Sequence, residues 1–384
     1  MTNSYVKLGD LATYINGYAF KPKDRGDKGL PIIRIQDLTG NTYDKGFYDG
    51  KYPSKIEINN GDVLISWSAS LGVYLWNGGK ALLNQHIFKV IFDKKEIDKD
   101  YFIYAVRFSL KRLHQLTHGA TMKHIVKKDF DNVVIPYPSI KKQKEIAFNL
   151  DKIESIIKTR QQEIRMLDTL IKARFVEMFG DPMIKKDDRN LRKLKEICII
   201  NPKKNLASKF TNDIEVSFVP MSSVSEQGDI DVSQRKNYSE VRKGFTYFAE
   251  NDVLFAKITP CMENGKGAIA TGLINGIGFG STEFHILRPI KNITNPYWIY
   301  VLTSFKSFRK LAEVNMTGSA GQRRVPATFL KDYEVRLPPI ELQNEFASFV
   351  QQVDKSKVVN ASIMKYIISI RFYLYFKENK EGAR

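Results

Sequence analysis

The chain has 384 residues, 43% of them hydrophobic and 27% charged, so its composition is that of a folded protein with room for two domains. Two cysteines, Cys198 and Cys261, argue against a disulfide framework or a cysteine-based zinc site and fit a reducing, cytoplasmic location. The N-terminus has no apolar signal region and no run approaches eighteen apolar residues, so no membrane contact is expected.

Among the bulk properties of this chain, the net charge of +18 differs most from that of an average globular protein. The excess is spread along the chain, with +6 on residues 1–139 and +8 on residues 183–338. Positive charge on two presumed domains predicts a polyanionic ligand bound by both, most simply nucleic acid. A generally basic soluble protein is the alternative that charge alone leaves open.

Residues 1–139 are predicted to form the first domain. Short β-like runs at 31–35, 62–66 and 86–91 alternate with turn residues, and a helix is predicted at 101–116. This mixture of short strands and a helix predicts a domain of α/β type.

A heptad repeat predicts one long helix within residues 140–182. Its seam consists of Ile146, Leu150, Ile153, Ile157, Ile164, Leu167, Ile171 and Met178, with Arg160 and Arg174 at the two remaining positions. Gly180 and Pro182 supply a helix stop.

Residues 183–338 are predicted to form a second domain, followed by a second long helix within 339–384. Its seam consists of Phe346, Val350, Val353, Met364, Ile367 and Leu374, interrupted by Lys357, Asn360 and Arg371. A lone helix of about 35–40 residues, roughly 50–60 Å long, would expose such a seam, so we expect the two helices to pair antiparallel. Packing of each helix on its own domain is the alternative.

The chain also repeats itself at a distance of about two hundred residues. Residues 135–147 are echoed by residues 335–347, with Pro, Ile, Gln, Glu and Ala at matching positions. Residues 60–65 are echoed by 250–255 and residues 101–104 by 297–300. This period fits a duplicated domain, and the copies match better at their ends than in their middles. One scaffold that recognises two different ligands is therefore predicted.

The ordered set of motifs, present twice, resembles the specificity subunit of type I DNA restriction–modification systems over nearly the whole chain. The motifs are the two Pro-Ser/Pro-Ile-x-x-Gln-x-Glu-Ile/Phe-Ala segments that precede the long helices, together with residues 17–21, 32–38, 61–66 and 83–88. The resemblance implies an α+β fold: two duplicated α/β target-recognition domains joined by two long antiparallel coiled-coil helices. It also implies a non-catalytic subunit in which each domain reads one half of a bipartite DNA target and the helical pair sets the spacer.

The same resemblance implies the partners. They are double-stranded DNA, two modification (methyltransferase) subunits, which would dock on the helical pair, and restriction (translocase and endonuclease) subunits. No cofactor is expected on this chain, because S-adenosylmethionine, ATP and Mg²⁺ would be bound by the partner subunits. A stand-alone DNA-binding regulator and the recognition part of a fused restriction or methylation enzyme are the alternatives.

Motifs that suggest an enzyme each have a simpler interpretation. The segment Asn295-Pro296-Tyr297-Trp298 lacks the second proline of an adenine methyltransferase loop, and Asn295 is expected to cap a helix instead. No nucleotide-binding P-loop sequence occurs. His114, His118 and His124 permit a metal site by spacing, but the pair His114 and His118 encloses no acidic residue and has no counterpart in the second copy. We therefore expect no catalytic centre and no metal.

Side chains that read bases must offer donors or acceptors on loops at the ends of strands and helices. The first-domain candidates are Lys21, Lys23, Arg25, Ser66, Trp67, Ser68, Ser70, Lys80, Asn84, Gln85, His86, Thr121, Lys123 and His124. The second-domain candidates are Lys203, Lys204, Lys257, Thr259, Lys266, Ser281, Thr282, Glu283, Gln322, Arg323 and Arg324. Lysine and arginine are predicted to contact phosphates, and Asn, Gln, Glu and Ser to contact base edges. For each residue, a solvated surface role is the alternative.

Overall fold

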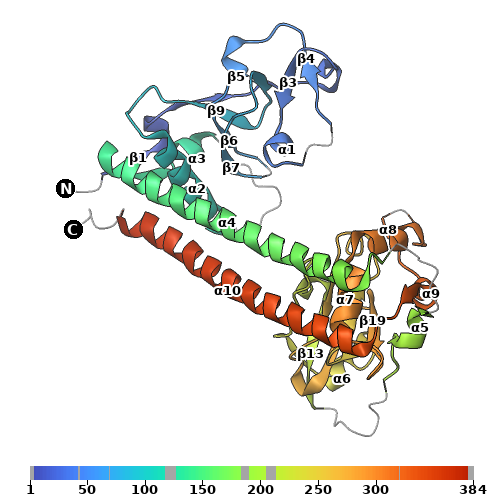
Figure 1. Ribbon diagram of the computed structural model, residues 1–384. Helices are drawn as coiled ribbons and strands as arrows, with labels where there is room; N and C mark the ends of the chain where they lie inside the picture. Colours follow the sequence, from blue (N-terminus) through green and yellow to red (C-terminus); the bar gives the residue numbers. More distant parts are fainter. Residues whose placement is uncertain are drawn as a thin grey trace. The chain divides into compact units, whose positions relative to one another are not determined.

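The structure is a computed structural model that describes residues 4–41, 44–68, 70–116, 127–182, 190–204, 213–319 and 321–378. It divides into two compact units: residues 1–159 with 364–384, and residues 160–363. Each long helix therefore contributes to both units, and each unit is described by itself below. The fold is α+β, as predicted, with two copies of one domain and two long antiparallel helices (Figure 1).

The first unit begins with the N-terminal domain. Its strands are β1 (Ser4–Lys7), β2 (Thr13–Asn16), β3 (Leu30–Ile33), β4 (Phe47–Tyr48), β5 (Glu57–Ile58), β6 (Val63–Ser66), β7 (Gly72–Leu75), β8 (Ala81–Leu83), β9 (Ile87–Ile91) and β10 (Val134–Tyr137). Its helices are α1 (Ile35–Leu38), α2 (Lys99–Leu116) and α3 (Lys127–Asp131), and the long helix α4 (Ile140–Phe179) follows.

The second unit contains the other domain. Its strands are β11 (Leu191–Lys193), β12 (Cys198–Ile200), β13 (Glu215–Val219), β14 (Arg235–Asn237), β15 (Thr246–Ala249), β16 (Val253–Ala256), β17 (Gly267–Ile269), β18 (Ile277–Gly280), β19 (Phe284–Pro289) and β20 (Glu334–Arg336). Its helices are α5 (Leu194–Ile197), α6 (Tyr238–Val241), α7 (Pro296–Ser304), α8 (Lys306–Val314) and α9 (Ala327–Asp332), and the long helix α10 (Ile340–Glu378) follows.

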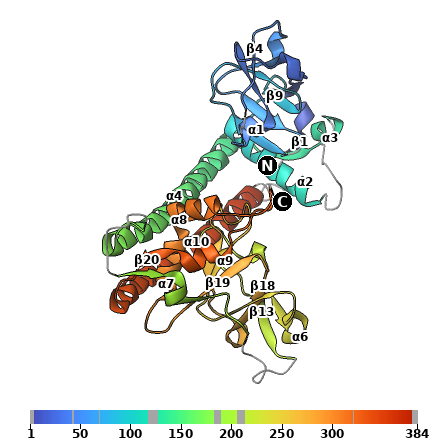
Figure 2. The same cartoon turned by 90° about the vertical axis from the view of Figure 1, so that its right-hand side faces the viewer.

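The two domains have the same strand order in every sheet of the described residues. In the first domain the orders are β2-β9-β6-β7, β4-β3-β8-β5 and β1-β10; in the second they are β12-β19-β16-β17, β14-β13-β18-β15 and β11-β20. Each domain also contains one parallel pair at the same place, β3 with β8 and β13 with β18. Figure 2 shows β13 and β18 side by side. The duplication therefore extends through the middles of the domains, where the sequences differ most.

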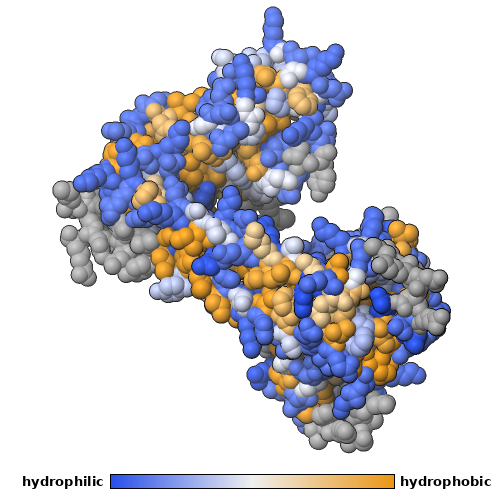
Figure 3. Space-filling model, in the orientation of Figure 1, coloured by the Kyte–Doolittle hydropathy of each residue, from blue (hydrophilic) through white to orange (hydrophobic). Residues whose placement is uncertain are grey.

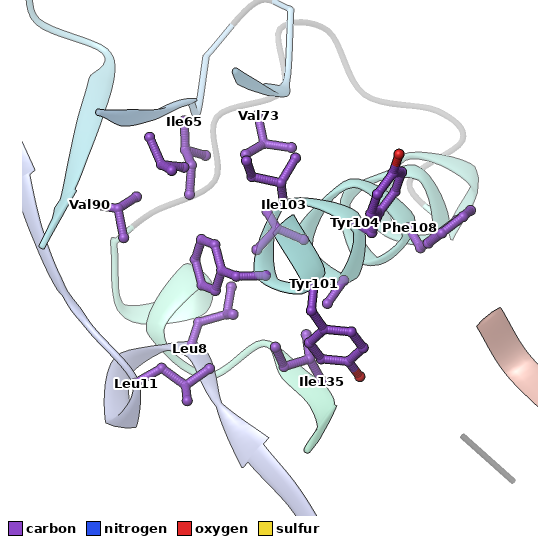
Figure 4. Close-up of a cluster of buried hydrophobic side chains, with 14 of the residues drawn as sticks. Leu8, Leu11, Ile65, Val73, Val90, Tyr101, Ile103, Tyr104, Phe108 and Ile135 are labelled. Carbon is purple, nitrogen blue, oxygen red and sulfur yellow. The ribbon is translucent and has the colours of Figure 1, made fainter. Parts of the chain in front are cut away.

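The core of the first domain lies between its central sheet and α2. Ile103 of α2 is packed with Ile65, Val73 and Val90, side chains from three strands of that sheet (Figure 4). Phe102 of α2 belongs to the same cluster. Apolar side chains recur on the inner face of each strand because successive residues of a strand point to opposite faces. The same cluster includes Leu8, Leu11, Ile135, Ile146 and Leu150, so the start of α4 is anchored on this domain.

The structure shifts the boundaries of all three predicted strands, and the predicted strand at 62–66 begins one residue later, at Val63. The predicted strand at 31–35 ends at Ile33, because the backbone N–H of Arg34 donates to Asp37 (2.7 Å) and α1 begins at Ile35. The predicted strand at 86–91 begins one residue later, at Ile87. His86 has a φ of 72°, a left-handed conformation that a strand residue does not adopt.

In the second unit, α4 and α10 are paired through contacts that run in opposite directions along the two helices. The rings of Phe175 and Phe346 are 5.5 Å apart. Lys357 forms an ion pair with Asp168 (2.7 Å), and Arg160 donates a hydrogen bond to Asn360 (3.2 Å). The partner's number rises along α10 as it falls along α4, so the pairing is antiparallel, as predicted.

In the first unit the same pairing continues to the other ends of these helices. Arg371 of α10 forms an ion pair with Glu154 of α4. The ring of Tyr375 stacks on Phe108 of α2 at 4.4 Å, and both belong to the same buried cluster as Leu150. The C-terminal part of α10 is thus held by both α4 and the domain.

The polar seam positions are each paired across the helices. Besides the contacts of Arg160, Lys357, Asn360 and Arg371, Arg174 reaches Glu345 at 3.2 Å. A half-buried charge inside an apolar seam is costly unless it has a partner, and a polar pair is satisfied in one alignment of two helices only. We infer that these interruptions favour this register over shifted ones.

Candidate nucleic-acid interface

In the second domain, three of the predicted segments meet at one edge of the central sheet. Strand β16 ends at Ala256 beside Phe284, the first residue of β19, so the loops that follow β16 and precede β19 leave the sheet together. The backbone N–H of Lys257 donates to Glu283 (2.9 Å), and that of Thr259 donates to Arg323 (3.0 Å). The topology therefore brings residues 257–259, 281–283 and 322–324 into one surface.

An ion pair fixes two of these segments to each other. Arg324 donates to both carboxylate oxygens of Glu283, most closely from Nε to Oε2 (2.9 Å) and from Nη2 to Oε1 (2.8 Å). The hydrogen-bonded guanidinium holds the pKa of Glu283 below its ordinary value. Both side chains are partly exposed, and their hydrogen-bonding groups are already engaged with each other in this structure.

A buried histidine connects the same edge to the loop that follows β12. The imidazole of His285 donates from Nε2 to the carbonyl of Val325 (2.8 Å), and its Nδ1 accepts from Asn201 (3.0 Å). Burial lowers the pKa of His285, so its neutral form is favoured. Asn201 precedes Lys203 and Lys204, and this bridge thus places the two lysines at the same edge of the sheet.

A surface cavity of about 600 Å³ lies at this edge. It is lined by Asn201, Pro202, Lys203, Lys204, Tyr238, Thr246, Tyr247, Lys257, Thr282, Phe284 and Ile286. Three lysines and no carboxylate are among these residues, so the cavity favours an anion. Its tyrosines supply hydroxyl groups and flat aromatic faces, which suit contacts to bases and sugars as well as to phosphates.

Tyr238 and Tyr247 were not among the residues predicted from the sequence. Tyr238 is the first residue of α6 and Tyr247 lies in β15, and neither is next to a predicted segment in the chain. Neither tyrosine has a lysine or arginine as its direct neighbour, so the local sequence gives no signal for them. Tertiary structure brings them to the cavity.

The other predicted residues of the second domain lie around this edge with protein partners of their own. Thr259 donates to Glu263 (2.8 Å), Lys266 donates to the carbonyl of Met221 (3.1 Å), and Ser281 accepts from the N–H of Glu283 (3.2 Å). Arg323 lies 3.8 Å from Glu263 and 3.9 Å from Glu313, whereas Gln322 is exposed.

The first domain uses the equivalent edge of its own central sheet. Strand β6 ends at Ser66 opposite Ile87, the first residue of β9. The N–H of Trp67 donates to the carbonyl of His86 (3.2 Å), and the N–H of Gln85 donates to that of Tyr18 (2.9 Å). Residues 66–68, 84–86 and 17–20 therefore converge as their counterparts do in the second domain.

The side chains at this first edge differ in exposure. Ser66 and Ser68 are buried, and the Ser66 hydroxyl donates to the carbonyl of Ser70, so these serines shape the turn. Trp67 is partly buried, donates to Asn16 (3.3 Å) and stacks on Phe88. Ser70 is exposed, and Asn84, Gln85 and His86 are partly exposed.

A row of aromatic rings adjoins this edge and was not predicted as part of the site. Tyr18 is 45% exposed; its ring is 5.0 Å from that of Phe20, which is 5.2 Å from that of Tyr48. Exposed aromatic rings beside lysine provide stacking surfaces for bases. The motif Gly17-Tyr18-Ala19-Phe20-Lys21 was the signal that could have identified Tyr18 and Phe20.

The remaining predicted residues of the first domain are mostly basic. Lys21 and Lys23 are exposed around a short turn at Pro22–Asp24, and Arg25 forms an ion pair with Asp44 at 2.7 Å. Lys80 forms an ion pair with Glu57 at 3.0 Å. Thr121, Lys123 and His124 lie outside the described residues.

The described residues contain no group of three or more His, Cys, Asp or Glu side chains that could hold a metal ion. His118 and His124, and the side chain of His114, lie outside them. Asn295 caps α7 by accepting from the N–H of Tyr297 (2.9 Å), as predicted. Among the described helices, none is long and apolar enough to cross a membrane.

Comparison with known families identifies the fold. The sequence model of the family called type I restriction modification DNA specificity domain matches residues 2–166 and 186–365 of this chain. The chain belongs to this family. The model matches twice, once on each copy of the sequence repeat, and this confirms the resemblance predicted from the motifs.

Individual relatives agree with the family match. The EcoAI specificity subunit of Escherichia coli is 44% identical over 153 residues, which cover 39% of this chain and 25% of that protein. The StySPI specificity subunit of Salmonella potsdam is 23% identical over 386 residues, which cover 90% of this chain and 81% of that protein. In the matches to EcoAI and EcoEI, this chain spans about a quarter of the relative's length.

A solved chain shows the same fold. It comes from work on complex assembly and conformational transition of the type I R-M system, and it superposes with a TM-score of 0.56 at 16% identity. The alignment covers 98% of this chain and 97% of that one. This likeness confirms the fold class.

Proposed function

We propose that this chain is the DNA-specificity subunit of a type I restriction–modification complex. Each domain would bind one half of a bipartite, asymmetric target at the sheet edge described above. The observation that carries the proposal is the duplication itself: two domains with identical strand order present different side chains at equivalent edges. Shared topology with different loops is the expected design for reading two different half-sites.

The long helices would act as a ruler between the two half-sites. Two readers on one side of B-DNA are expected roughly 34–36 Å apart, one helical turn, or a multiple of it. A helix of 40 residues such as α4 is about 60 Å long and stiff when paired, so it can fix a separation of this order. The bases between the half-sites would then remain unread.

Chemistry would come from other subunits. We propose that two modification subunits dock on the helical pair and that restriction subunits join them, with S-adenosylmethionine, ATP and Mg²⁺ bound by these partners. Exposed apolar side chains of α10, including Val358 (65% exposed) and Val359 (58%), support a docking role. Figure 3 shows apolar surface along this helix. The chain alone is proposed to be non-catalytic.

One experiment tests this function directly. The chain is co-expressed with a modification subunit in cells that lack other adenine methyltransferases, and methylated adenines are mapped across the genome. We expect one bipartite motif that is absent when either protein is omitted. Methylation by this purified chain alone would instead support the fused-enzyme alternative, and no motif with any modification subunit would support a stand-alone regulator.

Lysines of the second-domain cavity should account for part of the DNA affinity. Replacing Lys203, Lys204 and Lys257 by alanine should weaken binding of the assembled complex and reduce its salt dependence. Each lost phosphate contact makes the negative slope of log K against log salt shallower by about one unit. The slope of the triple variant should therefore be roughly two to three units shallower than that of the wild type. Fluorescence anisotropy at several salt concentrations measures this.

A control is available at the other end of the same sheet. Lys291 is exposed and follows the far end of β19, away from the cavity. Lys291→Ala should leave both affinity and slope unchanged. Equal effects of the two sets of substitutions would mean that the cavity makes no specific contribution and that general positive charge drives binding.

A further inference from the structure

The most strongly repeated segment of the chain contains a glutamine that is fully buried in both copies. Gln143 and Gln343 each lie on the first turn of a long helix, and neither is accessible to solvent. A buried amide is costly unless its donor and acceptor are both satisfied. Because the glutamine occurs at the same position in both copies, we expect it to have a structural role.

In the first copy, Gln143 connects three parts of the domain. Its Oε1 accepts from the backbone N–H of Asp98 (2.9 Å), and its Nε2 donates to the carbonyl of Pro138 (2.8 Å). Asp98 immediately precedes α2 and caps it, because its carboxylate accepts from the N–H of Tyr101 (2.9 Å). The glutamine thus ties the start of α4 to the start of α2.

The second copy repeats this arrangement. Gln343 accepts at Oε1 from the N–H of Asn295 (2.9 Å) and donates from Nε2 to the carbonyl of Pro338 (2.8 Å). A further bond from Nε2 reaches the carbonyl of Ile293 (3.1 Å). Asn295 is the cap of α7, the counterpart of α2. Both copies therefore use one amide to join a long helix to the capping residue of the domain's own helix.

The amide at this position affects the direction of the long helix more than the attachment of that helix to its domain. Apolar contacts of Ile146 and Leu150 in one copy, and of Phe346 and Val350 in the other, already hold each long helix on its domain. Apolar contacts are non-directional, whereas two hydrogen bonds from one planar amide fix an angle. They act at the first turn, where a small change in angle becomes a large displacement at the end of a 40-residue helix.

We propose that Gln143 and Gln343 are positioning residues that fix the angle between each recognition domain and its long helix, and so make the complex strict about spacer length. The proposal rests on the proposed function, in which the helices are the ruler. It predicts that loss of the amide relaxes the permitted spacer and leaves both half-site sequences unchanged.

The test uses the full complex with its modification subunit. Gln143→Met and Gln343→Met keep the size of the side chain and remove both hydrogen-bonding groups. Methylation of targets whose spacer is one base pair longer or shorter should rise at least tenfold over the wild-type level, with the half-sites conserved. A purely structural role would lower methylation of all targets together. Gln162→Leu and Gln352→Leu, exposed glutamines on the same two helices, should leave the spacer distribution unchanged.

Two further measurements keep the outcome decisive. If a methionine variant does not fold, Gln143→Glu or Gln343→Glu replaces it. Glutamate retains the hydrogen-bond acceptor and the side-chain volume, and the methylated targets of this variant are mapped in the same way. In the wild type, hydrogen exchange should show the amides of Asp98 and Asn295 protected at least tenfold beyond exposed loop amides. Unprotected amides, or a wild-type spacer distribution in a folded variant, would overturn the proposal. Absence of any bipartite motif with the wild type would instead overturn the proposed function.

Discussion

A chain in which both long helices are lengthened by four residues should recognise the same half-sites across a spacer that is one to two base pairs longer. The insertions belong after Arg160 in α4 and before Asn360 in α10, so that the hydrogen bond between these residues is retained. Four helical residues add about 6 Å, and each base pair spans about 3.4 Å. Genome-wide mapping of methylated adenines measures the spacer.

A longer insertion distinguishes the effect of helix length from the effect of a shift in the heptad repeat. Seven residues in each helix restore the heptad repeat, and should add about 10 Å, or close to three base pairs. Alanine at the exposed Gln161 and Gln162 changes composition near the same point without changing length, and should leave the spacer as it is. An active complex whose spacer stays constant in both insertion variants would show that the helices are not the ruler.

The second large effect is expected from two adjacent isoleucines of α4. Ile157 is 7% exposed in the seam, whereas Ile156 is 45% exposed. Ile157→Asp would place an unpaired carboxylate between the helices and should cost about 3 kcal/mol or more of the free energy of unfolding. Ile156→Asp should cost less than about 1 kcal/mol. Urea unfolding followed by circular dichroism compares the two.

The second unit offers the same comparison. Ile171 is 7% exposed and belongs to that unit's core, whereas its neighbour Leu170 is 47% exposed. Aspartate should destabilise at position 171 far more than at position 170. If buried and exposed positions lost stability equally, the apolar seam would not be what holds α4 and α10 together.

The long helices could be predicted because their signal is local and long. A repeat of three and four residues sustained over 35–40 residues has no other regular structure that would bury it. Seam positions such as Arg160 and Arg174 were identified from spacing alone. Their pairing with Asn360 and Glu345 could not be predicted, since these partners lie 171–200 residues away in the chain.

The candidate interface was predictable only as a set of loops. Polar residues between short strands marked segments that the fold brings together, because strands end where such residues cluster. Spacing does not tell which side chains reach the surface: Ser66 and Ser68 look like base contacts in sequence but are buried. Tyr238 and Tyr247 gave no local signal, and strand order alone brought them beside Lys257.

By itself, the sequence determined the duplication, the two domains' α/β character, the paired helices and the family, because each of these is a pattern repeated along the chain. Only the tertiary structure decided that the differing middles share one strand order and which loops meet at the sheet edges. It also gave the reason for the repeated glutamines. Gln143 and Gln343 can be recognised in the sequence as the same residue at matching positions of the repeat. The backbone amides that they bind belong to Asp98 and Asn295, more than forty residues away in each case. Long-range hydrogen bonds are set by packing, which local patterns do not encode.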